Sequence, residues 1–79
     1  MEIKIKYFGS MAEETGKAEE IVIMQDGTVE IPYFKAFIFN KYGLMEDDTI
    51  QVAINQTLKQ NGKIHNGDEI AFLPPYAGG

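Results

Sequence analysis

The segment NGDEIAFLPPYAGG, residues 66–79, decides the fold. Its first three residues, Asn66-Gly67-Asp68, are a turn signal. In residues 69–73, Ile70 and Phe72 alternate with their neighbours, which is the two-residue period of a half-buried strand. The two prolines that follow favour an extended, semi-rigid course. The segment therefore predicts a final strand followed by a short tail.

Working outward from this segment, further strands are predicted over residues 2–8, 19–24 and 50–54. The first and third of them show the same alternation of apolar and polar residues. A short segment around residues 57–59 is expected to pair weakly with its neighbour. The chain thus contains four or five strands that can form one sheet.

The main helix is predicted between these strands, across residues 29–42, and Gly43 is expected to end it. Its apolar residues recur at helical spacing. Pro32 conflicts with a start at Thr28, because it would remove the first intrahelical hydrogen bond. The helix is therefore expected either to start later or to open with an irregular turn.

A second, short helix is predicted after the first strand. Ser10 and Glu13 match the capping box, in which each side chain bonds the backbone N–H of the other residue. Gly16 supplies a left-handed stop about two turns later.

The order of the elements predicts an α+β layer architecture of the β-grasp type, with one main helix on one face of a mixed sheet of four to five strands. Residues 1–73 are expected to form the single domain and residues 74–79 a flexible tail. The predicted core consists of the inward-facing residues of the strands and the helix: Ile3, Ile5, Phe34, Ile38, Val52, Ile54, Ile70 and Phe72.

The composition excludes several classes of function. The net charge of −5 and the absence of arginine argue against nucleic acid, whose binding depends on clustered basic residues. The chain has no cysteine, so it has neither disulfides nor thiolate chemistry. No apolar stretch approaches a membrane span, and the N-terminus enters a strand pattern without a signal peptide, so we expect a cytoplasmic protein.

Strand parity predicts an apolar patch on the face of the sheet that the helix leaves uncovered. If the predicted core residues face inward, their neighbours face outward, and the apolar ones among these are Phe8, Ala53, Ala71 and Leu73, with Leu58 beside them. A contiguous apolar patch on the solvent side of a sheet is typical of a binding surface.

The segments VAINQTL (residues 52–58) and NGDEIAFLPPYAGG (residues 66–79) closely resemble MoaD, the small subunit of molybdopterin synthase, within the ubiquitin-like MoaD/ThiS family of sulfur carriers. This resemblance implies that an E1-like enzyme, MoeB, adenylates Gly79 with ATP, after which the group becomes a thiocarboxylate. It also implies that the tail enters the large subunit, MoaE, and gives its sulfur to a pterin precursor. The chain would then be a sulfur-donor subunit of a transferase complex.

The resemblance assigns roles to individual residues. Gly78 and Gly79 form the reactive end, and without side chains their backbone can thread a narrow channel. Docking of both partners is expected at the outward-facing residues of the sheet and at the start of the tail: Phe8, Leu58, Leu73, Pro74, Pro75 and Tyr76. No cofactor and no metal site are expected, because the only histidine, His65, has no cysteine or other histidine nearby.

Three alternatives remain open. The chain could be a sulfur carrier for thiazole formation in thiamine synthesis, although Pro74-Pro75 and the stretch Asn55-Gln56-Thr57 favour the molybdopterin branch. It could be a ubiquitin-like modifier that is attached to lysines through the same activated glycine. It could also be a β-grasp binding module without chemistry, since a fold does not determine a function.

Overall fold

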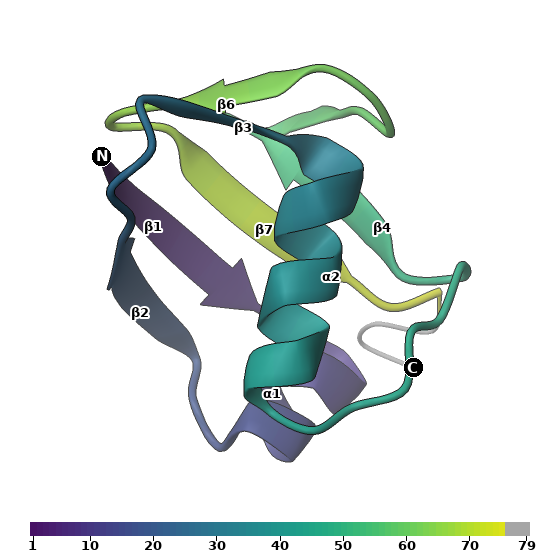
Figure 1. The fold of residues 1–79 in the computed structure, drawn as a ribbon. Coiled ribbons are helices and arrows are strands. Elements are labelled where there is room, and N and C mark those ends of the chain that lie inside the picture. Colours follow the sequence, from purple (N-terminus) through teal and green to yellow (C-terminus); the bar gives the residue numbers. More distant parts are fainter. Residues whose placement is uncertain (76–79) are drawn as a thin grey trace.

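A mixed five-stranded sheet with one long helix across one face forms the body of the molecule (Figure 1). The structure, a computed structural model, describes residues 1–75. The strands are β1 (Glu2–Tyr7), β2 (Glu19–Ile23), β3 (Thr28–Glu30), β4 (Gln51–Ile54), β5 (Thr57–Leu58), β6 (Lys63–His65) and β7 (Glu69–Leu73). The helices are α1 (Gly9–Thr15) and α2 (Ile31–Lys41).

The strand order of the main sheet is β2-β1-β7-β4-β5. The neighbouring strands β1 and β7 run parallel, while the β1–β2, β4–β7 and β4–β5 pairs are antiparallel. The predicted α+β β-grasp architecture is confirmed, and the final strand has the predicted bounds. No helix within residues 1–75 is long and apolar enough to cross a membrane.

A second sheet of two strands, β3 and β6, was not predicted. Val29 was assigned to the main helix, but it lies in β3 and pairs with Ile64 of β6. Each of these strands has only three residues, which is too short for a two-residue period to be recognised. The pair covers one end of the core (Figure 1), since Val29 and Ile64 are both buried.

The helix α2 starts two residues later than predicted, and this start accommodates Pro32. Ile31 is the first helical residue, so Pro32 lies in the first turn. The N–H groups of this turn have no partner within the helix, so a proline removes nothing there. The expectation of a later start is thus confirmed. The helix ends close to Gly43, which has a φ of +66°.

The predicted capping box of α1 is wrong. The N-cap residue is Phe8, it makes no side-chain capping bond, and Ser10 lies inside the helix. The sequence pattern placed the cap two residues too late. The stop at Gly16 is confirmed, because this residue has a φ of +74° and its N–H donates to the carbonyl of Ala12 at 3.0 Å.

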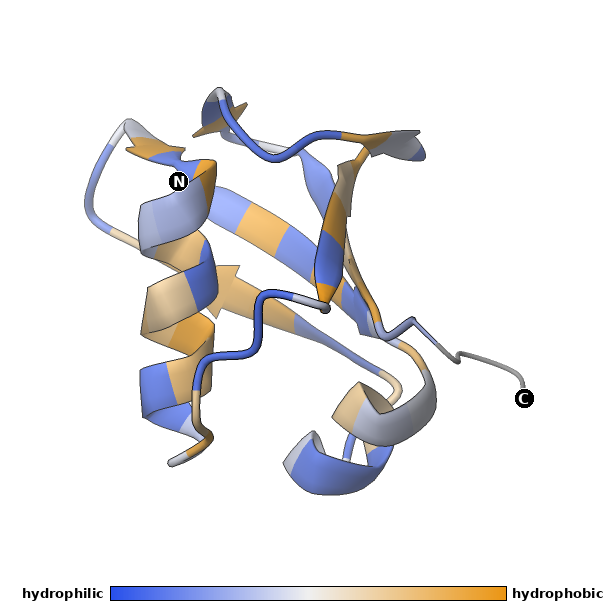
Figure 2. Ribbon diagram, turned by 90° about the vertical axis from the view of Figure 1, so that its right-hand side faces the viewer, coloured by the Kyte–Doolittle hydropathy of each residue, from blue (hydrophilic) through white to orange (hydrophobic). Residues whose placement is uncertain are grey.

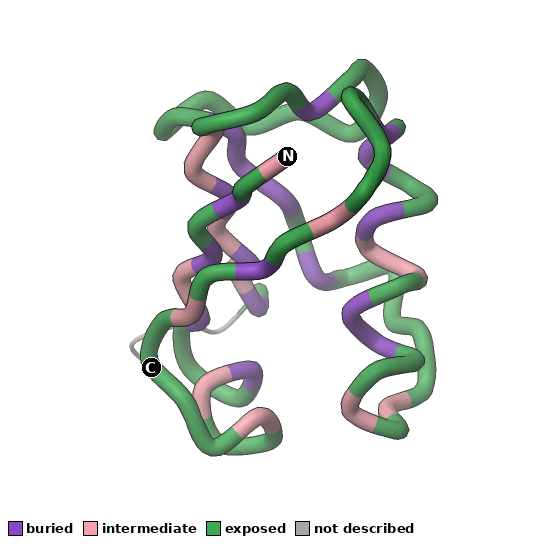
Figure 3. Tube along the Cα trace, turned by 60° about the vertical axis from the view of Figure 1, so that its left-hand side comes forward, coloured by how far each residue is buried: buried purple, intermediate pink, exposed green. Residues whose placement is uncertain are grey.

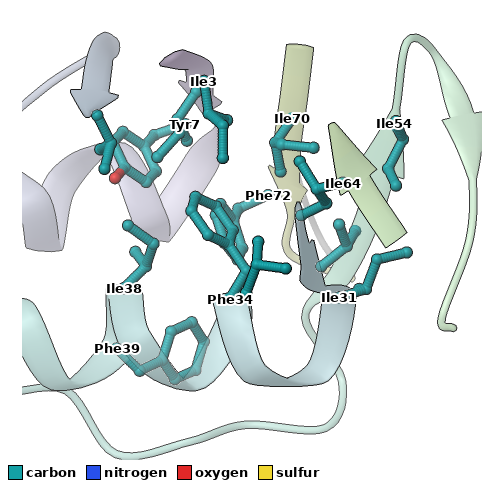
Figure 4. Packing of buried hydrophobic residues seen from close by; sticks show 14 of the residues in the cluster. Ile3, Tyr7, Ile31, Phe34, Ile38, Phe39, Ile54, Ile64, Ile70 and Phe72 are labelled. Carbon is teal, nitrogen blue, oxygen red and sulfur yellow. The ribbon is translucent and has the colours of Figure 1, made fainter. Parts of the chain in front are cut away.

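The core lies between α2 and the sheet, and all eight predicted core residues are buried. Figure 4 shows the packing within this cluster. Phe72 of β7 lies at the centre of the core and is fully buried. Its ring centroid lies 5.9 Å from that of Tyr7, 6.2 Å from that of Phe39 and 6.5 Å from that of Phe34. Apolar and polar residues alternate along β1 (Figure 2), and buried residues alternate with more accessible ones along β1 and β7 (Figure 3).

A cluster of polar side chains around Glu20 ties β1 and β2 to α2 and the residue that follows it. The carboxylate of Glu20 accepts hydrogen bonds from the hydroxyl of Tyr7 at 2.6 Å and from the hydroxyl of Tyr42. The ammonium groups of Lys17 and Lys41 each lie 3.3 Å from it. Burial alone would raise the pKa of Glu20, but these hydrogen bonds together lower it from 4.5 to about 2. The charged form of Glu20 therefore stabilises the fold.

We expect Glu20→Gln to lower the free energy of unfolding at neutral pH by about 3 kcal/mol, because a pKa shift from 4.5 to about 2 corresponds to roughly that much. Since the folded-state pKa is depressed, the contribution is present above pH 4.5 and disappears as the pH falls toward 2. Urea unfolding of both proteins between pH 7 and pH 2 measures the difference. A constant difference over this range would show that the charge of Glu20 contributes nothing.

Candidate functional site

A hollow of about 270 Å³ lies on the face of the main sheet opposite α2. It is lined by all five apolar residues of the predicted patch: Phe8, Ala53, Leu58, Ala71 and Leu73. Three polar residues, Lys6, Gln56 and Glu69, complete the lining. Strands from the middle and from one edge of the sheet thus build a concave apolar surface, which we call the docking hollow.

Strand parity explains why these residues gather there. Ile70 and Phe72 of β7 are fully buried, so Ala71 and Leu73 between and after them face the other side and are half-buried. Phe8 follows β1 with 42% of its surface exposed, and Leu58 of β5 is 58% exposed. The predicted register is therefore correct.

Ala53 differs from the expectation in its exposure. It lines the docking hollow, but it is buried, with 5% of its surface accessible. It pairs with Ala71 on one side and with Leu58 on the other, and its single methyl group does not reach beyond its neighbours. Ala53 therefore forms the floor of the hollow, while Phe8 and Leu58 stand above it.

A tight turn positions Leu58 over the hollow. Asn55 and Gln56 connect β4 to β5, and both have positive φ angles, +49° and +72°. A two-residue hairpin turn of this kind requires positive φ at both positions. The side chain of Asn55 fixes the turn against β7, because its Oδ1 accepts from the N–H of Glu69 at 3.0 Å and its amide donates to Asp68 at 3.1 Å.

We expect Gln56→Gly to raise the free energy of unfolding by about 0.5–1 kcal/mol, because a residue with a side chain is strained at positive φ. The same change removes a side chain from the wall of the docking hollow. Urea denaturation tests the first effect, and Gln56→Ala, which keeps the strain, is the control. A destabilised Gln56→Gly protein would contradict this account of the turn.

One ion pair lies at the docking hollow. The ammonium of Lys6 is 3.5 Å from the carboxylate of Glu69, and both side chains are about one-third exposed, at 38% and 32%. The two charges neutralise each other, so the hollow offers a nearly neutral apolar surface with one polar pair. An apolar partner can cover such a surface without burying an uncompensated charge.

The predicted tail leaves the sheet beside the docking hollow. Leu73, the last residue of β7, lines the hollow. Pro74 is buried against the chain itself, and Pro75 is exposed. The remaining predicted site residues, Tyr76, Gly78 and Gly79, lie outside the described residues.

The other titratable candidates have structural roles or none. Asp68 shapes the turn before β7, as predicted, because its carboxylate accepts from the N–H of His65 at 2.8 Å. His65 is exposed and lies at the end of β6. Within residues 1–75 no three His, Cys, Asp or Glu side chains are close enough together to hold a metal ion.

Sequence reasoning missed two features of the surface. Ile21 and Ile23 of β2 are exposed on the same side of the sheet as the docking hollow, at 59% and 70%. Their exposure follows from the parity of β2, in which Val22 is the buried residue. A second hollow, of about 360 Å³, lies between the start of α2 and β4.

Comparisons with known proteins agree on one family. The model of the ThiS family matches residues 5–79. The molybdopterin synthase sulfur carrier subunit of Escherichia coli K12 is 34% identical over 80 aligned positions, which cover 98% of this chain and 99% of that protein.

Two solved structures share the fold. SAMP1, a small archaeal modifier protein from Haloferax volcanii, superposes with a TM-score of 0.79 at 23% identity over all of both chains. Subunit 1 of the molybdopterin-converting factor of Helicobacter pylori, solved in complex with subunit 2, superposes with a TM-score of 0.68 at 24% identity, again over all of both chains.

Proposed function

The chain belongs to the ThiS family, and from this premise we propose that it is the sulfur-carrier subunit of a molybdopterin synthase. The observation that carries the proposal is the relative from Escherichia coli, which bears this name and is similar over nearly its whole length. The alignment is not confined to the sheet, since the family match extends to residue 79 and so includes the glycines to which we assign the chemistry.

The proposed chemistry takes place at the carboxylate of Gly79. A carboxylate is a poor acyl donor until one oxygen becomes part of a good leaving group. An E1-like enzyme would join it to the AMP part of ATP and release pyrophosphate, and a sulfur donor would then displace AMP to leave a thiocarboxylate. The chain depends on a partner for this step, because it has no glycine-rich phosphate loop with a P-loop lysine.

We assign the docking hollow to the large subunit and to the E1-like enzyme. Three observations support this assignment. The hollow is apolar and nearly neutral, it lies on the uncovered face of the sheet, and Leu73 in its wall is immediately followed by the tail. A partner seated on Phe8, Leu58 and Leu73 would thus receive the tail directly. The complex of the Helicobacter pylori protein with its subunit 2 shows that a protein of this fold pairs with a second subunit.

Conversion of the pterin precursor tests the proposed branch. The thiocarboxylated chain, mixed with a molybdopterin synthase large subunit and the cyclic pterin precursor, is expected to yield the dithiolene product. The same chain, mixed with a thiazole synthase and its substrates, is expected to yield no thiazole. Product in the second mixture alone would assign the chain to thiamine synthesis instead.

A second function is favoured by one specific observation, the similarity in fold to a small archaeal modifier protein. An activated Gly79 could acylate a lysine of a target protein in the same way that it accepts sulfur. The two functions differ in their products. A modifier leaves conjugates of higher mass in its native host, and these persist after boiling in detergent and reductant, whereas a carrier leaves none.

A further inference from the structure

The outer edge of β2 is an unpaired edge of the main sheet. β2 stands at the end of the strand order and pairs only with β1 among residues 1–75. The N–H of Tyr7 donates to the carbonyl of Ala18 at 2.8 Å, and the N–H of Met24 donates to the carbonyl of Met1 at 2.9 Å. Even-numbered residues of this segment therefore direct their backbone groups toward β1.

Because these directions alternate along a strand, the N–H and C=O groups of the odd-numbered residues Glu19, Ile21 and Ile23 point away from the sheet. An edge of this kind is a template for another strand, and natural proteins protect such edges with proline, charged side chains, inward-pointing charges or bulges. The sequence of β2, EEIVI, contains neither proline nor lysine, and its two glutamates are confined to its first two residues, which leaves Ile21, Val22 and Ile23 without a charge. Its side chains Ile21 and Ile23 are also more than half exposed, so the same residues offer hydrogen bonds and apolar surface.

The sequence of β2 complements itself in the antiparallel direction. When two copies overlap over all five residues, Ile21 lies opposite Ile21 of the second copy and Glu19 lies opposite Ile23. Glu20 then lies opposite Val22, so no two carboxylates face each other. A shift that placed Glu20 opposite Glu20 would set like charges against each other, which destabilises a strand pair. A shift the other way leaves only three of the five residues paired.

We propose that two copies of this chain associate through β2, with the Ile21 residues opposite each other, to form one continuous ten-stranded sheet. Each Ile21 exchanges both backbone hydrogen bonds with its counterpart, and the two exposed Ile21 side chains come to lie beside each other. The contact leaves the docking hollow free, because the hollow reaches to β5, at the opposite edge of the sheet. The pair thus presents two docking hollows on one face, and the proposal is independent of the proposed function.

Single cysteines test the register, since the natural chain has none. Cα atoms of residues that exchange both hydrogen bonds are about 5.5 Å apart, within the range of a disulfide. Ile21→Cys is therefore expected to form a covalent dimer under mild oxidation. In Ile23→Cys the two cysteines are offset by four residues, or about 14 Å, so no dimer is expected although this position is more exposed.

Sedimentation of the full chain without cysteines tests the association itself. The natural chain is expected to associate increasingly as its concentration rises. Ile21→Glu is expected to raise the dissociation constant of the dimer at least tenfold, because it sets two carboxylates opposite each other. Within one chain the new carboxylate lies opposite Lys4, so folding is retained. Leu58→Glu, in the docking hollow, is the control and should associate like the natural chain.

Several results would overturn the proposal. A natural chain that is monomeric at all concentrations contradicts it. So does equal cross-linking of Ile23→Cys, or cross-linking only in a mixture of the two cysteine variants, which would indicate a different register. Loss of association in Leu58→Glu but not in Ile21→Glu would place the contact in the docking hollow.

Discussion

Deleting Gly79, or adding one residue after it, is expected to abolish sulfur transfer while folding and docking are retained. The reason is positional. One residue of extended chain spans about 3.3 Å, whereas a misplacement of about 1 Å at a reacting centre can already cost roughly 100-fold in rate. Precursor conversion with the large subunit is the measurement, after activation with the E1-like enzyme, ATP and a sulfur donor. The body of the domain should be unaffected, because residue 79 lies beyond the last strand.

Gly79→Ala is the matched control for the change of length. The reach of the chain is kept, and only a methyl group is added to the terminal residue, so conversion should fall by much less than in the deletion. Calorimetry should give unchanged affinity of all three variants for the large subunit. If the protein lacking Gly79 supported normal conversion, the sulfur-carrier function would be wrong and a plain binding module would be the better account.

Leu73→Asp and Phe8→Asp are each expected to abolish binding to the large subunit. Both side chains line the docking hollow, and a carboxylate covered there by an apolar partner has no cation left to pair with, because Lys6 is already paired with Glu69. An unpaired buried charge costs several kcal/mol, and each 1.4 kcal/mol lowers the affinity tenfold. Calorimetric titration should therefore show a loss of affinity of at least 100-fold.

Met45→Asp is the control for this prediction. Met45 is 91% exposed and lies in the loop after α2, away from the lining of the docking hollow. The substitution adds the same charge to the protein, so it controls for the change in net charge. The affinity of this variant for the large subunit should stay within about twofold of that of the natural chain. Thermal unfolding should show that Leu73→Asp and Phe8→Asp remain folded. Unchanged affinity in both variants would mean that the partner binds another face.

The main features of the fold could be predicted because inward-facing and outward-facing residues alternate along the strands with a period of two. Ile70 and Phe72 fixed the inner face of β7, and this parity in turn placed Leu73 on the outer face, where the docking hollow is found. The elements outside the longer strands were predicted less accurately. Val29 and Ile64 form a strand pair of only three residues each, and a pair this short depends on contacts between distant segments and not on local pattern.

The local chemistry of the turns was also beyond prediction. Ser10 and Glu13 have the residue types of a capping box, yet the chain enters α1 at Phe8, one residue after the end of β1. The position of a helix start is set here by the preceding strand. Glu20 is bonded in its cluster to residues up to 22 positions away in the sequence, so no spacing rule could indicate it. The hollow itself depends on the turn at Asn55 and Gln56, which brings Leu58 over Ala53.

The intact mass of the protein purified from its native host tests the central claim most directly. A thiocarboxylate replaces one oxygen of Gly79 by sulfur, so the account predicts a species heavier by about 16 Da than the unmodified chain. Fragmentation should assign the increase to the final residue, which separates it from oxidation of one of the four methionines, a change of similar nominal mass. Mild hydrolysis should return the chain to its unmodified mass. A chain found only at its unmodified mass, or modified only at methionine, while the host is making the cofactor would contradict the account.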